Sequence, residues 1–170
     1  EVASENGFPK VEDSIEELLS ITIKNHQSKQ IVVFGVGDYT NNREDVRYVK
    51  CESEDELLKK FLTFWETHKP DVVTGWNSKF YDLPYLIHRI KYRFGENEVK
   101  RLSIWKSVFK DSVYIAGKEH ICYNINGLEQ LDYLDLYRKF TYSAQESYRL
   151  DHIAFVELGE RKAPNPFDTY

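Results

Sequence analysis

The sequence contains no methionine among its 170 residues and only two cysteines, Cys51 and Cys122. Because these cysteines lie far apart and form no Cys-x-x-Cys pattern, neither a disulfide framework nor a structural zinc site is expected. No apolar run approaches the roughly 20 residues that cross a bilayer, and no signal peptide opens the chain. These absences predict a globular protein of the cytoplasm that has no membrane partner.

The composition fits a folded domain with an uneven charge. Apolar residues make up 41% of the sequence and aromatic residues 15%, enough for a real core in a chain of single-domain size. The formal net charge of −5 argues against broad, non-specific binding of nucleic acid. Residues 1–60 carry 13 acidic and 8 basic side chains, whereas residues 86–111 carry 7 basic and 3 acidic ones. The basic stretch fits either a solvated helix face or a track for phosphates.

The first half of the chain predicts a hairpin, a strand and a helix. Residues 18–24 and 30–36 are β-rich and flank a polar turn, which is typical of a hairpin, and Val46–Cys51 fits an edge strand. Ser53, with Glu56 three residues later, forms a capping box that opens a helix. Pro70 predicts the end of this helix.

The second half predicts alternating strands and helices. Residues 71–74 fit a short buried strand, and residues 83–94 a helix that Gly95 ends. Residues 112–126 predict a second hairpin that turns at Gly117, residues 128–133 fit a strand, and residues 147–158 a helix. This order of elements predicts a mixed sheet with helices packed on it.

Asp82 stands where an apolar strand ends and a helix begins, at the end of the pattern Asn-x-x-x-Tyr-Asp that starts at Asn77. In a structural interpretation Asp82 is the helix N-cap, Asn77 satisfies a turn, and Pro84 is tolerated in the first helical turn. In a functional interpretation Asp82 binds Mg²⁺, which takes one or two protein carboxylates and completes its shell with phosphate and water. Spacing alone leaves both interpretations open.

Two further candidates lie at the start of the chain. Glu1 opens a segment that fits a strand, but taken alone it is only a terminal residue. Gly7-Phe8-Pro9 predicts a rigid turn with an aromatic ring at its centre. Phe8 either packs in a core or offers a platform on which an unpaired base can stack.

Together these segments resemble the 3′→5′ proofreading exonuclease domain of family B DNA polymerases, most closely those of T-even-like phages and their marine relatives. The family's first motif is Asp-x-Glu followed by a Gly-Phe-Pro turn; Glu1 looks like that Glu, with the Asp expected two residues before the chain starts. The second motif, Gly-Trp-Asn-x-x-x-Phe-Asp-x-Pro-Tyr, matches residues 75–85, with Tyr81 in place of the usual Phe. Residues 131–140 and 147–153 also resemble segments of the phage enzymes.

The third motif of the family, Tyr-x-x-x-Asp, is not found, and the family spacing would put it beyond Tyr170. The resemblance therefore implies that residues 1–170 are a partial exonuclease domain of a larger DNA polymerase, truncated before that motif. A start at Glu-Val-Ala-Ser and an end in an expected loop fit such a fragment.

The resemblance also implies a fold and a chemistry. The fold would be α/β and ribonuclease H-like, a mixed sheet flanked by helices, with residues 112–126 as an extra β-hairpin that helps to move a primer end. Glu1 and Asp82 would be two of the four carboxylates that hold two Mg²⁺ or Mn²⁺ ions for hydrolysis of the 3′-terminal nucleotide. Phe8 would stack at the 3′ end, and Asn77, Phe80 and Tyr81 would shape a single-strand cleft.

The expected partners are the 3′ end of single-stranded DNA, primer–template DNA and the remaining polymerase domains, in the host cytoplasm for a phage-encoded enzyme. With only two of four ligands, the isolated chain is expected to be inactive. Two alternatives remain: a stand-alone ribonuclease H-like nuclease, and a non-catalytic nucleic-acid-binding module in which Asp82 is only a helix cap. The second hairpin also fits a plain surface hairpin.

Overall fold

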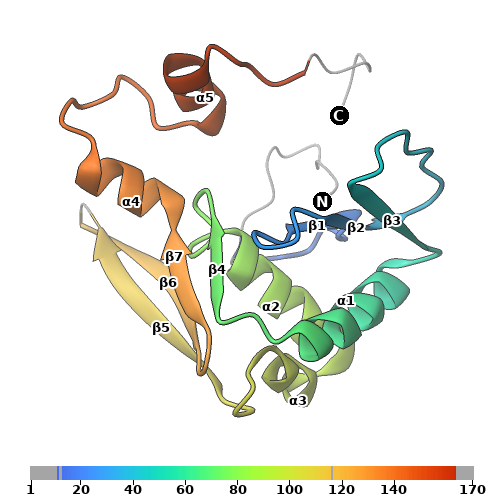
Figure 1. Cartoon of the computed structure of the whole chain (residues 1–170). Coiled ribbons are helices and arrows are strands. Elements are labelled where there is room, and N and C mark those ends of the chain that lie inside the picture. Colours follow the sequence, from blue (N-terminus) through green and yellow to red (C-terminus); the bar gives the residue numbers. More distant parts are fainter. Residues whose placement is uncertain (1–10, 12, 116, 164–170) are drawn as a thin grey trace.

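A computed structural model describes residues 11, 13–115 and 117–163 (Figure 1). The first sheet contains β1 (Ser20–Lys24), β2 (Ile31–Val36) and β3 (Val46–Cys51). β1 and β2 form the predicted antiparallel hairpin, and β3 pairs with β2 in parallel at the edge of the sheet. The β-rich runs and the polar turn between them were sufficient to predict this unit.

α1 (Glu54–His68) begins and ends as the sequence predicts. Ser53 Oγ accepts a hydrogen bond from Glu56 N (3.4 Å), while the Glu56 carboxylate accepts one from Glu52 N (2.7 Å), one residue earlier than in a standard capping box. Apolar side chains at helical spacing are buried against the first sheet and neighbouring helices: Leu57, Leu58, Phe61, Leu62 and Trp65.

The middle of the chain forms β4 (Val72–Gly75), α2 (Asp82–Phe94), the short helix α3 (Glu96–Val99) and the 3₁₀ turn η1 (Lys100–Leu102). Gly95 ends α2 with φ +89°, in the backbone region that glycine adopts at low cost. The predicted strand and helix are therefore confirmed, each within one residue at its bounds.

The last part contains a hairpin, a strand and two helices. β5 (Val108–Ile115) and β6 (Lys118–Ile125) pair antiparallel around Gly117. β5 begins four residues before the predicted hairpin, and β6 ends one residue before its predicted end. β7 (Glu129–Asp132) pairs in parallel with β4. α4 (Tyr133–Phe140) was not predicted, and α5 (Leu150–Leu158) begins three residues later than predicted.

The described strands form three sheets: a mixed sheet β1–β2–β3, the parallel pair β4–β7 and the hairpin β5–β6. Figure 1 shows α1 below the first sheet and α2 between this sheet and the hairpin, with α4 next to β7 and α5 beyond α4. The architecture is therefore mixed α/β. Among the helices of the described residues, none has both the length and the apolar character needed to span a bilayer.

A buried ion pair joins α1, α2 and the segment that leads into β1. Arg89 Nε and Nη2 donate to Glu54 Oε1 (2.8 Å) and Oε2 (2.5 Å), and both side chains are at most 3% exposed. Arg89 Nη1 also donates to the carbonyls of Ser14 (2.8 Å) and Ile15 (2.9 Å), and Glu54 Oε1 accepts from Leu18 N (2.9 Å). Because each charge is fully hydrogen-bonded, removal of either partner leaves the other buried without compensation.

We expect Arg89→Met to lower the free energy of unfolding by about 3–5 kcal/mol, the usual cost of an unpaired buried charge. Chemical denaturation followed by circular dichroism measures this. Arg43→Met is the matched control, because Arg43 forms an exposed pair with Asp45 and its loss should leave the midpoint nearly unchanged. Equal midpoints for the two variants would contradict the importance given to the buried pair.

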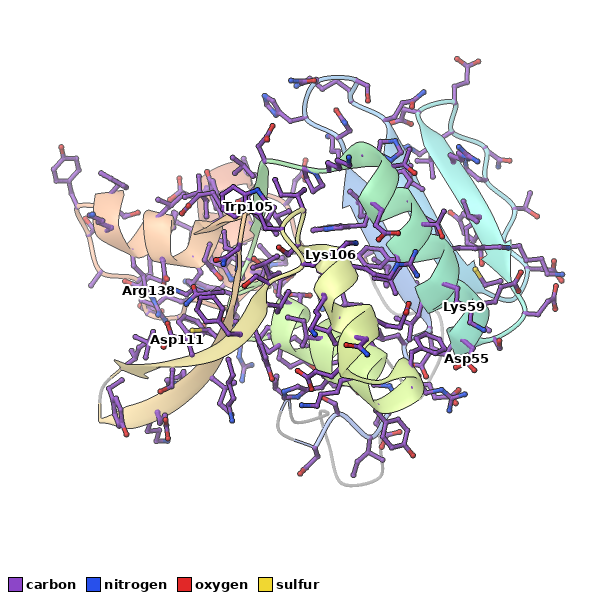
Figure 2. The ribbon with its side chains drawn as sticks, turned by 90° about the horizontal axis from the view of Figure 1, so that it is seen from below. Asp55, Lys59, Trp105, Lys106, Asp111 and Arg138 are labelled. Carbon is purple, nitrogen blue, oxygen red and sulfur yellow. The ribbon has the colours of Figure 1, made fainter. Side chains whose placement is uncertain are left out.

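The ion pairs of Glu66 in α1 should make the stability of the protein depend on pH. A hydrogen bond from Arg101, and a smaller contribution from one donated by Lys106, lower the pKa of Glu66 from 4.5 to about 2. Lys106 is labelled in Figure 2. A lowered carboxyl pKa contributes stability that is complete above the unfolded-state pKa and is lost as pH falls through the folded-state value. Glu66→Gln should therefore destabilise the protein at pH 7, and the difference from wild type should shrink between pH 4.5 and 2 in thermal melts. A difference that stays constant with pH would contradict this.

Candidate functional site

The turn at residues 76–81 joins β4 to α2 and contains most of the second motif. Asn77 has φ +61°, in the left-handed region that asparagine tolerates better than most residues. Its carbonyl accepts hydrogen bonds from the N–H groups of Phe80 (3.3 Å) and Tyr81 (3.0 Å). The backbone thus reverses direction tightly and presents the side chains of this segment at the end of β4.

Gly75 allows the turn to lie close to the strand that precedes it. A Cβ atom at Gly75 would lie 2.9 Å from Ser78 Cβ, a distance that real Cβ atoms essentially never show. Ser78 is buried, and its carbonyl accepts a hydrogen bond from Leu83 N (3.0 Å) in the first turn of α2. The motif therefore requires glycine at position 75 for steric reasons.

Asp82 is the first residue of α2, and the N-cap residue is Tyr81. The structural interpretation of Asp82 as the N-cap is therefore wrong, because the helix begins one residue earlier than the cap prediction requires. A carboxylate in the first turn still interacts favourably with the helix dipole. Asp82 is exposed, and its position at a rigid strand–turn–helix junction offers the hard oxygen ligand that Mg²⁺ or Mn²⁺ prefers.

A cleft of about 810 Å³ lies beside this turn. The turn contributes Asn77 and Phe80, β6 contributes Lys118 and His120, and α4 contributes Arg138. The start of α5 closes another side. Tyr81 and Asp82 are not among the described residues that line this cleft, so the predicted contact of Tyr81 with a DNA strand stays a prediction.

The lining of the cleft carries more positive than negative charge. Its Lys and Arg side chains are Lys118, Arg138, Arg149 and Lys162, against Asp135 and Asp151. The Arg138 guanidinium lies 4.6 Å from the ring centroid of Tyr148, a cation–π contact that restrains it. Figure 2 shows Arg138 on the α4 side of the molecule, opposite Asp55 and Lys59 of α1. This balance suits a phosphate chain, which attracts Lys and Arg electrostatically.

Aromatic contacts hold the walls of the cleft. The Phe80 ring lies edge-on against His120, with centroids 5.6 Å apart, and Trp76 Nε1 donates to the Tyr148 carbonyl (3.2 Å). Tyr81 instead stacks on Tyr85 of α2, with centroids 6.0 Å apart. Two of the predicted DNA-binding side chains, Asn77 and Phe80, thus meet at one cleft.

Hydrogen bonding also links the two helices at this end. Tyr137 of α4 donates to Glu157 Oε1 of α5 (2.5 Å). This hydrogen bond, together with burial, raises the pKa of Tyr137. The α4 wall of the cleft is therefore supported by α5.

Glu1 and Phe8 lie outside the described residues. Within residues 11, 13–115 and 117–163, no three His, Cys, Asp or Glu side chains gather closely enough to hold a metal ion. Asp82 is the described residue that was predicted as a ligand. A metal centre at its carboxylate therefore stays a prediction.

Asp132 is a site residue that the sequence analysis missed. It ends β7, is 5% exposed, and its carboxylate accepts hydrogen bonds from the N–H groups of Asn77 (3.1 Å), Lys79 (2.9 Å) and Leu134 (2.9 Å). The signal available in the sequence was an Asp, a preferred N-cap residue, directly before the amphipathic segment at residues 133–140. Residues 128–133 were instead interpreted only as a strand.

The basic stretch at residues 86–111 is mostly engaged in ion pairs. Five of its basic side chains contact carboxylates: Arg89, Lys91, Arg93, Arg101 and Lys106. This arrangement argues against a phosphate track, but because Arg89 is buried the stretch is not purely a solvated helix face either. Four other Lys and Arg side chains line the cleft.

Comparison with known proteins identifies the family. The family model for the exonuclease domain of DNA polymerase family B matches residues 1–153. The chain belongs to this family. The resemblance inferred from residues 75–85 is thereby confirmed.

The sequence of this exonuclease-domain chain is similar to those of viral and cellular DNA polymerases. It is 40% identical over 120 residues to the DNA-directed DNA polymerase of Escherichia phage RB69, and 36% identical over 120 residues to that of Enterobacteria phage T4; each match covers 70% of this chain and 13% of the phage protein. It is 31% identical over 167 residues to the DNA polymerase delta catalytic subunit of Candida albicans, covering 91% of this chain and 16% of that protein. The chain thus spans under a fifth of the length of these relatives.

The steric requirement at Gly75 gives a direct test of the motif turn. Gly75→Ala should destabilise the protein by about 1–3 kcal/mol, the usual cost of overpacking, because its Cβ meets Ser78 Cβ at 2.9 Å. Ser78→Gly removes that atom, so the double variant should be more stable than the sum of the single effects predicts. Urea denaturation of all four proteins completes the cycle; strictly additive effects would contradict the close contact.

Proposed function

We propose that this chain is part of a 3′→5′ proofreading exonuclease in a longer family B DNA polymerase and takes a ribonuclease H-like fold. Membership of the exonuclease-domain family over residues 1–153 and the mixed α/β architecture support this. DNA synthesis would then reside in other domains of the longer protein. The remaining metal ligands would come from the segments that flank this chain.

The observation that carries the proposal is the cleft at the second motif. Asn77 and Phe80 line it beside Lys118 and Arg138, so a polar amide, an aromatic ring and positive charge converge on one space. Single strands are held by this combination, because aromatic rings stack on any base and Lys or Arg side chains attract the phosphates. The substrate class that fits is the 3′ end of single-stranded DNA, as produced by a mispaired primer terminus.

In this proposal Glu1 and Asp82 are two of four carboxylates that bind two divalent ions, Mg²⁺ or Mn²⁺. When bound, such a pair of ions supplies an activated water and stabilises the leaving 3′-oxygen. The rigid start of α2 would hold the Asp82 carboxylate in place as a ligand for these ions. Asp82 is suited to this because its backbone is fixed by the turn and by α2.

The other residues would bind and orient the strand. Phe8 stacks on the 3′-terminal base, Asn77 and Phe80 hold the following nucleotide, and Tyr81 supports this wall from its stack on Tyr85. The β5–β6 hairpin contributes Lys118 and His120 to the cleft, which suits a role in guiding a separated primer strand. Contacts of this kind position the terminal phosphodiester and exclude water from the wrong side of it.

A longer chain, extended on both sides to include the flanking motifs, should degrade 5′-labelled single-stranded DNA from its 3′ end in the presence of Mg²⁺ or Mn²⁺. Asp82→Asn in that chain should reduce the rate about 10³-fold or more, because a metal ligand contributes several kcal/mol to transition-state stabilisation. The 170-residue chain alone should show no such activity. Gel analysis of timed digests measures all three.

Asp71→Asn is the matched control, since Asp71 is an exposed carboxylate directly before the first residue of β4, whereas Asp82 follows the other end of this strand. It should leave the rate unchanged, and chelation by EDTA should abolish activity in both wild type and control. Robust 3′→5′ degradation by the 170-residue chain, or an active Asp82→Asn variant, would contradict the proposal.

A further inference from the structure

Asp132 holds together two segments that are far apart in the sequence. Its position at the end of β7 places it in register with Gly75, the last residue of β4. The two strand ends lie side by side. β4 continues into the turn that leads to α2, and β7 continues directly into α4. The Asp132 carboxylate is buried at the point where these two segments diverge.

On one side the carboxylate binds the backbone of the motif turn. Oδ1 accepts from Asn77 N (3.1 Å), and Oδ2 accepts from Lys79 N (2.9 Å). These two N–H groups flank Ser78 and lie within the turn whose other backbone bonds run from Phe80 and Tyr81 to the Asn77 carbonyl. The carboxylate thus fixes the turn that carries Asn77 and Phe80 into the cleft.

On the other side the same carboxylate caps α4. Oδ1 also accepts from Leu134 N (2.9 Å), the bond that defines Asp132 as the N-cap of this helix. α4 then supplies Leu134, Asp135 and Arg138 to the lining of the cleft. One buried side chain therefore contacts the backbone of both the turn and α4, and these two segments form two walls of the cleft.

We propose that Asp132 is a positioning residue that sets the two walls of the single-strand cleft relative to each other and orients the turn leading to Asp82. The inference rests on the proposed function for the identity of the ligand, single-stranded DNA. Three N–H donors on two oxygens require a carboxylate, because an amide offers only one oxygen as acceptor. In Asp132→Asn at least one buried N–H loses its acceptor, which is costly where water cannot replace it.

The test uses the full polymerase and compares wild type with Asp132→Asn and Asp132→Ser. Serine can still cap α4 but is too short to hold the turn. Asp132→Ser therefore tests the contact with the turn apart from the cap of α4, even if Asp132→Asn folds poorly. We expect either variant to lower kcat/KM for single-stranded DNA about 5- to 100-fold, with a raised KM as well as a lower kcat. DNA synthesis on a matched primer by the same protein should remain at the wild-type rate.

The matched control is Ser53→Ala, which removes the N-cap of α1, a helix that contributes no residue to the cleft lining. Ser53→Ala should lower thermal stability without changing kcat or KM for exonuclease activity. If Asp132→Asn and Asp132→Ser behave like Ser53→Ala, with lower stability and unchanged kinetics, the positioning role is overturned.

Amide hydrogen exchange keeps this inference separate from the proposed function. The N–H groups of Asn77 and Lys79 should be protected in wild type and exchange at least tenfold faster in Asp132→Ser, whereas Leu134 N–H should change less. An inactive wild-type polymerase would overturn the proposed function, and the exchange data would then decide the positioning role alone. Unchanged exchange at Asn77 and Lys79 would overturn it in either case.

Discussion

The ion pair between Glu54 and Arg89 is the interaction on which the arrangement of this chain depends. It connects α1 to α2 and, through the carbonyls of Ser14 and Ile15, to the segment before β1. Buried charges bring little net stability, but they tolerate only the geometry that satisfies them. Because Asp82 is the first residue of α2, the pair that holds α2 in place also holds the helix from which Asp82 projects.

Two carboxylates at neighbouring strand ends have opposite environments. Asp132 is buried at the end of β7 and accepts three backbone hydrogen bonds, whereas Asp82 is exposed, lies seven residues beyond the end of β4 and begins a helix. The first suits a structural role because its charge is neutralised by N–H dipoles; the second suits a cation that approaches from solvent. The buried carboxylate organises the turn from which the exposed one is presented.

Much of this could be predicted from the sequence where the signals are local. Ser53, Gly95 and Gly117 mark helix and hairpin ends through caps and turn geometry, and each element they bound is present. α4 was missed because Leu131–Asp132 continues a strand pattern, although Asp132 caps α4 through a local hydrogen bond from Leu134 N. The second contact of Asp132 could not be predicted, because the Lys79 N–H that it binds lies 53 residues away in the sequence. The cleft could not be predicted for the same reason: its walls come from the turn, β6, α4 and α5, which only tertiary packing brings together.

We propose that Asp82 binds a catalytic metal in a family B proofreading exonuclease. The most direct measurement is the anomalous difference density of Mn²⁺ in crystals of the longer chain with a single-stranded oligonucleotide whose 3′ linkage resists hydrolysis. We expect Mn²⁺ within about 2.0–2.3 Å of an Asp82 carboxylate oxygen, the range of hard-cation coordination, and in contact with the terminal phosphate. Mn²⁺ bound at that phosphate through other side chains, with Asp82 turned away, would contradict it.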